Sequence, residues 1–320
     1  MVRRLREDLD GLEVAVAAVA EATGIPAAHV EKDFWLTEAL RGVAAAAERL
    51  GVPVYFKGGT SLSKVFGMIR RFSEDVDILA VLRSDDSAGA RHTVLKALCA
   101  GAVDATGLEA EPVGDKSSKG EKRAVTLRYP TRQALQPLRH EGVLVEIGHW
   151  GGTYPHERHT VRSLVADHGP ALGIDGLFEE FEHYEVEVLD PVRTAVEKLM
   201  LLHAAAIGEA ERRLAVARHY YDVWCLLQDD RIAGELADSR AVATMARDVE
   251  TFTRAAGLPS RGRPANGFAA SEAFDPSAPV NEPTHGAYDT VVLGSLLWEG
   301  SPRPSFEECC DAVRRFPSGL

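Results

Sequence analysis

A short stretch after residue 53 constrains the fold of this chain more than any other part of it. An apolar segment at 54–57 is typical of a β-strand, and Gly58–Gly59 follows it as a turn that opens a helix. A second apolar strand at 76–82 has Asp75 and Asp77 at its beginning. Side chains at i and i+2 of a strand share one face, so these two carboxylates are expected to converge.

This order of elements predicts a particular chemistry. Glycines at the start of a helix let a phosphate approach backbone N–H groups, where the helix dipole favours an anion. Two adjacent carboxylates repel each other unless a cation lies between them, and Mg²⁺ prefers oxygen ligands shared with substrate phosphates. We therefore predict nucleotidyl or phosphoryl transfer, and favour nucleotidyl transfer, with Mg²⁺ (or Mn²⁺) as cofactor and a nucleoside triphosphate as substrate. Asp75 and Asp77 are the predicted metal ligands, and exposed edge-strand acids are the alternative.

The predicted phosphate pocket is formed by residues in the glycine turn and close to it. Its seven candidate nucleotide-binding residues are Lys57, Gly58, Gly59, Thr60, Ser61, Lys64 and Ser73. Gly59 is expected to need a positive φ and an open space beside it. Lys64 has a solvated helix residue as its alternative. The hydroxyl of Ser73 could position phosphate or metal-bound water, could be modified, or could cap a turn.

Glu146 is a third candidate metal ligand. It stands in the middle of the apolar run 143–148, where a buried charge is costly unless it is paired or bound to a metal.

The same residues carry a family resemblance. The pattern Gly58-Gly59-Thr60-Ser61 followed by Ser73-x-Asp75-x-Asp77 resembles the signature of DNA polymerase β-like nucleotidyltransferases. The longer string KGGTSLSK…RFSEDVDI is similar to the AbiEii/AbiGii toxin branch, which is related to the mycobacterial MenT toxins. The resemblance spans about residues 25–230. Three further segments fit that branch: Glu31–Leu36, Glu197–Leu199 and His219–Asp222.

The resemblance implies catalytic roles for two residues outside the central motif. In AbiEii-like proteins the lysine that matches Lys198 points into the cleft toward the nucleotide, and the match to Asp222 makes it part of the active site, orienting Lys198 or the base. The alternatives are a snorkelling surface lysine for Lys198 and a helical i,i+4 pair with Arg218 for Asp222.

The fold class expected from the resemblance is α/β (α+β): a polymerase β-like core with a small mixed sheet, followed by a helical C-terminal domain. We expect N-terminal helices in 1–50, the nucleotidyltransferase core in 51–190 and the helical domain in 191–320. The segment 151–178 is rich in Gly, His and Pro and is expected to be an irregular connector. The other expected elements are helices at 12–22, 26–50, 60–68, 88–105, 191–206, 211–227, 239–255 and 305–316, strands at 124–129, 143–149 and 184–189, and a surface excursion at 257–286.

Bulk composition limits the partners. The net charge of −12 argues against a broadly basic surface for nucleic acid, but seven basic residues gather in one stretch, and Arg70 and Arg71 flank the catalytic loop. The basic stretch consists of Lys116, Lys119, Lys122, Arg123, Arg128, Arg132 and Arg139. It is expected either to bind the phosphate backbone of RNA or to be a solvated loop. No apolar run reaches the ~20 residues of a membrane span, so a cytoplasmic monomer is expected.

The function implied by the resemblance is that of a toxin from a toxin–antitoxin or abortive-infection system. Such an enzyme would transfer a nucleoside monophosphate to RNA, with the tRNA 3′ end as acceptor, and would thereby block translation. A cognate antitoxin is the implied partner. Two alternatives stay open: transfer to a protein or small-molecule hydroxyl, and a nucleotide-binding module without catalysis. The preferred nucleotide and the particular tRNA are not predicted by the sequence.

Overall fold

A computed structural model describes most of the chain, in residues 3–73, 75–83, 85–114, 121–131, 142–149, 151–208, 210–255, 262–316 and 320, the side chains of 210–212 excepted. The chain divides into two compact units. The N-terminal unit comprises residues 1–65, 72–149 and 157–188, and the C-terminal unit comprises 66–71, 150–156 and 189–320. The chain therefore leaves the N-terminal unit twice, at 66–71 and at 150–156, before the long C-terminal run begins.

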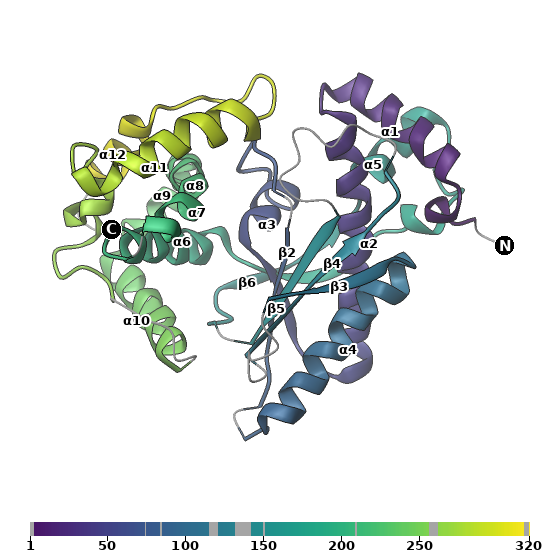
Figure 1. Cartoon of the computed structure of the whole chain (residues 1–320), viewed down its shortest axis with the longest axis horizontal. Helices are drawn as coiled ribbons and strands as arrows, with labels where there is room; N and C mark the ends of the chain where they lie inside the picture. The colour runs from purple at the N-terminus through teal and green to yellow at the C-terminus, as the bar shows by residue number, and fades with distance from the viewer. Residues whose placement is uncertain are drawn as a thin grey trace. The chain divides into compact units, whose positions relative to one another are not determined.

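The N-terminal unit is built on a mixed sheet, as the resemblance predicts. Its described strands form a seven-stranded sheet in the order β3-β4-β5-β2-β1-β7-β6. β2 pairs antiparallel with β1 and parallel with β5, which places it near the middle (Figure 1). The strands are β1 (Val54–Lys57), β2 (Asp75–Ala80), β3 (Glu109–Val113), β4 (Lys122–Arg128), β5 (Val143–Gly148), β6 (His156–Val161) and β7 (Tyr184–Leu189).

One face of this sheet is apolar and lies against helices. Phe56, Val76, Ile78, Val145 and Ile147 alternate along three neighbouring strands and are all buried. Alternation with period two sends the residues between them to the other face, which carries the acidic side chains. The helices of this unit are α1 (Leu9–Thr23), α2 (Ala27–Leu50), α3 (Gly58–Lys64), α4 (Ala88–Thr106) and α5 (Leu164–Leu172).

The helices α2 and α4 cross closely because each has a glycine at the crossing. A Cβ atom on Gly42 would come within 2.1 Å of the carbonyl oxygen of Gly101, and one on Gly101 within 2.4 Å of that of Gly42. Both helices therefore lie against the apolar side of the sheet with their backbones in contact. A larger residue at either position would force them apart.

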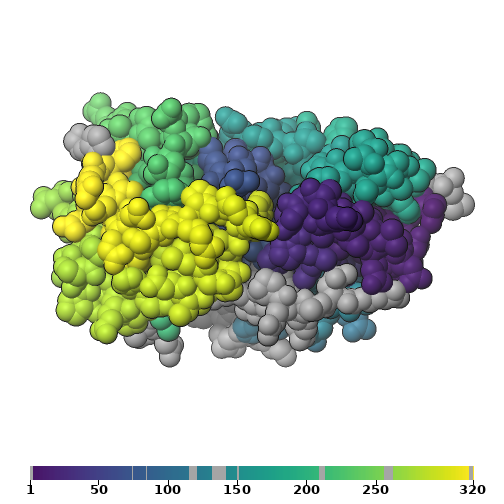
Figure 2. Space-filling view, turned by 90° about the horizontal axis from the view of Figure 1, so that it is seen from above, coloured from purple at the N-terminus to yellow at the C-terminus, as the bar shows by residue number. Residues whose placement is uncertain are grey.

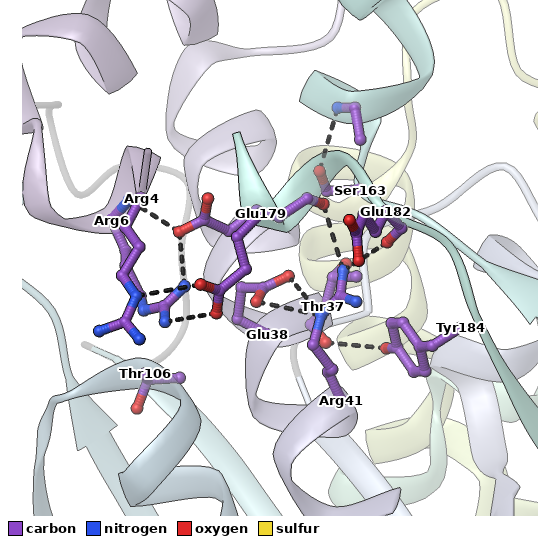
Figure 3. A network of polar contacts seen from close by, with 12 residues as sticks. Arg4, Arg6, Thr37, Glu38, Arg41, Thr106, Ser163, Glu179, Glu182 and Tyr184 are labelled. Atoms are coloured by element: carbon purple, nitrogen blue, oxygen red, sulfur yellow. Dashed lines mark hydrogen bonds and ion pairs between the residues drawn. The ribbon is translucent and has the colours of Figure 1, made fainter. Parts of the chain in front are cut away.

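The N-terminus is tied to the segment before β7 by a network of charged groups (Figure 3). The buried carboxylate of Glu180 accepts hydrogen bonds from Leu5 N at 2.9 Å and from Arg6 Nη1 at 2.7 Å. Glu38 on α2 is paired with Arg41, whose guanidinium also donates to the carbonyl of Glu182 at 2.7 Å. On the surface of the same unit, α1 (purple) lies beside the teal segment that carries α5 (Figure 2).

The C-terminal unit is helical, as predicted. Its helices are α6 (Pro191–Ala206), α7 (Ala210–Val216), α8 (Arg218–Leu227), α9 (Asp230–Leu236), α10 (Ser239–Ala255), α11 (Glu282–Ala287), the π-helix Tyr288–Leu296 and α12 (Phe306–Arg314). Asp190 caps α6 by accepting from Val192 N at 2.7 Å, and Ser305 forms a capping box with Glu308 on α12. Short 3₁₀ turns complete the described chain at Leu5–Glu7, Glu179–Phe181, Phe268–Ala270, Glu272–Phe274 and Pro279–Asn281.

Three expectations about elements are wrong. The segment 151–178 is not an irregular connector, because it contains β6 and α5. The helix expected at 211–227 is two helices that meet at Ala217. In the excursion expected at 257–286, the described residues from 262 onward form 3₁₀ turns and α11. Among the described residues no single helix has the length and hydropathy of a membrane span, and α1 and α2, which pass that test only together, are bent by 119°.

Candidate active site

The polar face of the sheet brings three predicted residues into one row. Lys57 on β1 is the register partner of Asp77 on β2, and Asp77 is the register partner of Glu146 on β5. Register partners point to the same side of a sheet, and Asp75 shares that side because it lies two residues before Asp77. All four side chains are half-buried. The structure thus places a lysine, two aspartates and a glutamate next to one another on a partly exposed face.

Gly58 is the residue that lets the turn approach the acidic strand. Its φ is +83°, and a Cβ atom added there would lie 2.2 Å from Asp77 Oδ2. An L-residue is therefore excluded twice, by backbone conformation and by the carboxylate. The expectation that Gly59 is the positive-φ glycine is wrong: Gly58 takes that conformation, and Gly59 is the buried second residue of α3.

Two hydroxyls predicted in the phosphate pocket fix the turn itself. Thr60 Oγ1 donates to the backbone carbonyl of Asp75 at 2.6 Å, and it lies 3.0 Å from Ser73 Oγ. Ser61 Oγ donates to the carbonyl of Gly58 at 3.0 Å. The Thr60 bond joins α3 to the start of β2, and the Ser61 bond closes the first turn of α3 on itself. The first backbone N–H groups of α3 have no partner within the helix, so the predicted contact with a phosphate falls to them.

Lys64, the last residue of α3, lies in an ion pair and is not a solvated helix residue. Its Nζ is 2.6 Å from Oδ1 of Asp33 on α2, with side-chain exposures of 8% for the lysine and 16% for the aspartate. Direct contact of Lys64 with a nucleotide, and that of Lys57, Gly59 and Ser61, stays a prediction.

The donors on the polar face suit a hard divalent cation. Asp75 and Asp77 supply carboxylate oxygens from one strand face, and Mg²⁺ is commonly held by one or two carboxylates together with substrate phosphates and water. Across the described ranges, no three His, Cys, Asp or Glu side chains are grouped so that they could hold a metal between them. The residues present therefore fit a two-carboxylate site that the triphosphate completes. A role for Glu146 as third ligand stays a prediction.

The C-terminal unit contains a separate buried cluster of charged groups around Asp222. Arg71 donates to both carboxylate oxygens, from Nε to Oδ1 at 2.6 Å and from Nη2 to Oδ2 at 2.7 Å. Lys198 Nζ lies 2.8 Å from Oδ2. Asp222 is fully buried, and Arg71 and Lys198 are 1% and 4% exposed. His219 Nδ1 lies 3.1 Å from Lys198 Nζ and 3.4 Å from Asp222. Because an ammonium can only donate, Nδ1 accepts from Lys198 and the imidazole proton is on Nε2.

Burial and charge set the protonation states in this cluster. Burial alone would raise the pKa of Asp222, but the charges of Arg71 and Lys198 outweigh it and hold that pKa well below its usual range. Burial lowers the pKa of Lys198, with Arg71 acting in the same direction and Asp222 against it. Burial and the charge of Lys198 lower the pKa of His219 to about 3. The cluster is a neutral histidine beside a carboxylate with two cationic partners.

The cluster also corrects part of the predicted RNA patch. Arg71 is buried in its bidentate pair, so it is not a surface contact for RNA, whereas Arg70 is exposed. On β4, Lys122 is exposed and shares the face of Glu146, but Arg123 is the register partner of buried Ile147 and lies on the opposite face. Arg128 is paired with Glu111 at 2.8 Å. Four members of the patch fall outside the described residues: Lys116, Lys119, Arg132 and Arg139.

A mixed sheet with paired carboxylates beside a glycine turn is the arrangement expected of a nucleotidyltransferase, and the family comparison agrees with it. The family model described as the nucleotidyl transferase AbiEii toxin of type IV toxin–antitoxin systems matches residues 39–284, more than half of the 320 residues. The chain belongs to the AbiEii toxin family. A search of curated proteins finds no match.

Among solved structures the chain is similar to MenT4, a nucleotidyltransferase toxin from Mycobacterium tuberculosis H37Rv. The TM-score is 0.39 at 19% sequence identity, and the alignment covers 70% of this chain and 72% of that one.

Two residues that organise these clusters were not assigned a role from the sequence alone. In the sequence, Asp33 stands only within a family-like segment, and Arg71 is expected to be a surface cation. The one available signal is the charged run Glu31-Lys32-Asp33 directly before Phe34 and Trp35, because charged side chains inside a largely apolar helix are seldom left without partners. Their partners are 31 and 151 residues away, respectively, which no local pattern reveals.

Proposed function

We propose that this toxin transfers a nucleoside monophosphate from a nucleoside triphosphate to a hydroxyl of RNA, with the 3′ end of tRNA as acceptor. The observation that carries the proposal is the row on the polar face of the sheet, where Lys57, Asp77 and Glu146 are register partners beside the turn at Gly58. Family membership supports a nucleotide as substrate and a cognate antitoxin as partner.

The proposed reaction assigns separate tasks to the residues of the N-terminal unit. The backbone N–H groups that open α3 and the ammonium of Lys57 bind the triphosphate. Asp75 and Asp77 would hold Mg²⁺ (or Mn²⁺), which would neutralise the negative charge of the phosphates. A carboxylate accepts the proton of the acceptor hydroxyl. The new bond joins the acceptor oxygen to the α-phosphorus, the bond from the α-phosphorus to its bridging oxygen breaks, and pyrophosphate leaves.

The tRNA 3′ end is the acceptor that best explains toxicity. Its terminal hydroxyls carry the amino acid, so an added nucleotide prevents aminoacylation and stops translation. Because tRNA works in the cytoplasm, the proposal places the toxin there. Transfer to a protein or small-molecule hydroxyl is the alternative acceptor class, and the same assay reports it.

The test is to incubate the protein with each labelled nucleoside triphosphate, Mg²⁺ and total RNA, and to run Asp75→Ala and Asp77→Ala beside the wild type. We expect label on tRNA with the wild type, none with either variant, and none after chelation of the metal. Asp85→Ala is the matched control, since Asp85 lies on the surface and 68% of its side chain is exposed. Full transfer by both Asp75→Ala and Asp77→Ala would refute the site. Label on protein alone would refute the RNA acceptor.

A further inference from the structure

Asp33 occupies a junction of three helices in the N-terminal unit. Its Oδ1 pairs with Nζ of Lys64 at the end of α3, at 2.6 Å, and its Oδ2 accepts from Leu164 N at 2.7 Å, which is the first backbone N–H of α5. One carboxylate thus links α2, α3 and α5. Of the groups in these two contacts, only the ammonium of Lys64 is predicted to bind substrate.

The link matters because α3 is a short helix, buried at Gly59–Leu62, whose polar contacts to other elements lie toward its two ends. It has seven residues, and helices of that length are not stable by themselves, so their tertiary contacts set their position. At its start α3 is joined to β2 through Thr60 and the carbonyl of Asp75. At its end it is joined to α2 by the pair of Asp33 and Lys64. Together with the burial of Leu62, these two attachments position the backbone that approaches Asp77.

The charges around this pair leave Asp33 as the main partner of Lys64. Burial raises the pKa of Asp167 on α5, and Lys64 and Arg162 act against that rise. Arg162 itself lies 3.8 Å from Asp167 and 3.5 Å from Asp175. A lysine that is only 8% exposed needs a full negative charge within contact, and Asp33 supplies it at 2.6 Å.

We propose that Asp33 is a positioning residue for nucleotidyl transfer: through Lys64 it holds α3, and with it the glycine turn, in register with the acidic strand β2. Lys64 is then an anchor of α3 and not a ligand of the triphosphate. The inference rests on the nucleotide site at Gly58 and Asp77, and it is independent of which acceptor is used.

Asp33→Asn separates the two contacts of Asp33. The amide oxygen of asparagine still accepts from Leu164 N and caps α5, but the charge that pairs with Lys64 is lost. Lys64→Met removes the same charge pair from the other side and keeps the length of the side chain. Glu185→Gln is the matched control, because Glu185 forms an exposed ion pair with Arg158 at 3.0 Å in the same unit.

The experiment measures three quantities for Asp33→Asn, Lys64→Met, their double variant and the control. These are the unfolding temperature, the Kd for a non-hydrolysable nucleoside triphosphate, and kcat for pyrophosphate release with a cell extract as acceptor source. The extract makes the assay valid whether or not tRNA is the acceptor, so a failure of tRNA alone would count against the proposed acceptor only.

We expect kcat to fall about 10- to 100-fold in both single variants, at a temperature where both are folded, and any change in Kd to have the same size in both, because both loosen the same helix. The double variant should be no worse than either single one, since both break one contact. Two results would overturn the proposal. Wild-type kcat in folded Asp33→Asn would make the pair merely structural. A large rise in Kd with Lys64→Met and none with Asp33→Asn would make Lys64 a phosphate ligand.

Discussion

At the scale of single residues, Gly58 links the backbone of the turn to the chemistry of the sheet. Its φ of +83° and the 2.2 Å between an added Cβ and Asp77 Oδ2 impose separate demands for glycine. The first demand concerns stability and is shared with any left-handed glycine. The second concerns the position of a catalytic carboxylate and belongs to Gly58 in particular.

Gly58→Ala should therefore abolish transfer beyond its effect on folding. The methyl group displaces the Asp77 carboxylate, while the strained φ costs about 1–3 kcal/mol of unfolding free energy. Gly107→Ala is the control, since Gly107 has φ +70° in the same unit and nothing within 4 Å of an added Cβ. Denaturant unfolding and kcat should show similar destabilisation in both variants and lost activity in Gly58→Ala alone. Equal activity in the two would show that Asp77 tolerates the methyl group.

Glu38 gives a residue-level prediction about pH. Burial, countered by Arg41 and reinforced by Glu180, raises the pKa of Glu38 from 4.5 to about 7. The folded protein therefore binds more protons at this site than the unfolded chain between these values. The contribution of Glu38 to stability is fully present below pH 4.5 and is lost as the pH rises through 7.

Glu38→Gln should stabilise the protein at pH 8, by about 1–3 kcal/mol, and change little at pH 5. The uncharged amide removes the cost of a buried negative charge, which exists only at the higher pH. Urea unfolding at the two pH values measures the difference, with exposed Glu21→Gln on α1 as control. A gain of equal size at both pH values would contradict the assigned titration.

At the scale of elements, α6 and α8 are joined through the pair that Asp222 makes with Lys198. The arginine that completes this cluster comes from the segment 66–71, not from the helix that carries Asp222. A variant that removes Asp222 therefore does more than remove a candidate catalytic group, because Arg71 cannot lose its charge when it is left buried.

Asp222→Ala should lower the free energy of unfolding by about 3–5 kcal/mol, the usual cost of breaking a buried ion pair from one side. Adding Arg71→Met should recover part of that loss, since the unpaired cation is then gone. The control is Asp311→Ala on α12, whose partner Arg315 is 80% exposed and whose loss should cost less than about 1 kcal/mol. Denaturant unfolding measures all three, and additive losses in the double variant would contradict the coupling.

Local patterns predicted the parts of the fold that depend on neighbours in sequence. The strand before Gly58 and the strand that begins at Asp75 follow from period-two alternation and glycine chemistry, and both are confirmed. β6 and α5 were missed for a physical reason: β6 reads His-Glu-Arg-His-Thr-Val, and α5 contains Pro170. Neither segment has the expected periodicity, and the Asp33 cap that supports α5 comes from another helix.

The candidate site also has residues that local sequence predicts and residues that it does not. The row of Lys57, Asp77 and Glu146 was predictable residue by residue, because each stands out against an apolar strand. The ion pairs of Lys64 and Arg71 were not, because their acids lie on distant helices. Periodicity indicates which face a residue occupies, but it does not identify the partner across that face.

At the scale of the whole molecule, a net charge of −12 must be reconciled with a polyanionic acceptor. Lys122→Ala should weaken transfer to tRNA, leave nucleotide affinity unchanged and reduce the log–log salt slope by about one unit, if it contacts one phosphate. Arg158→Ala is the control, an exposed arginine that is already paired with Glu185. Transfer and affinity are measured over a salt series, and an unchanged slope would exclude Lys122 from the RNA surface.

The passage of the chain through the C-terminal unit at 66–71 also has a consequence in time. Arg71 is synthesised 151 residues before Asp222, and Arg70 is synthesised 231 residues before Ser301, whose hydroxyl donates to the Arg70 carbonyl at 2.7 Å. At about 5–20 residues per second, Asp222 is synthesised about 8–30 s after Arg71. The connection between the glycine turn and the acidic strand is therefore secured only late in translation. We expect a nascent toxin to be inert on the ribosome until most of its C-terminal unit has been made.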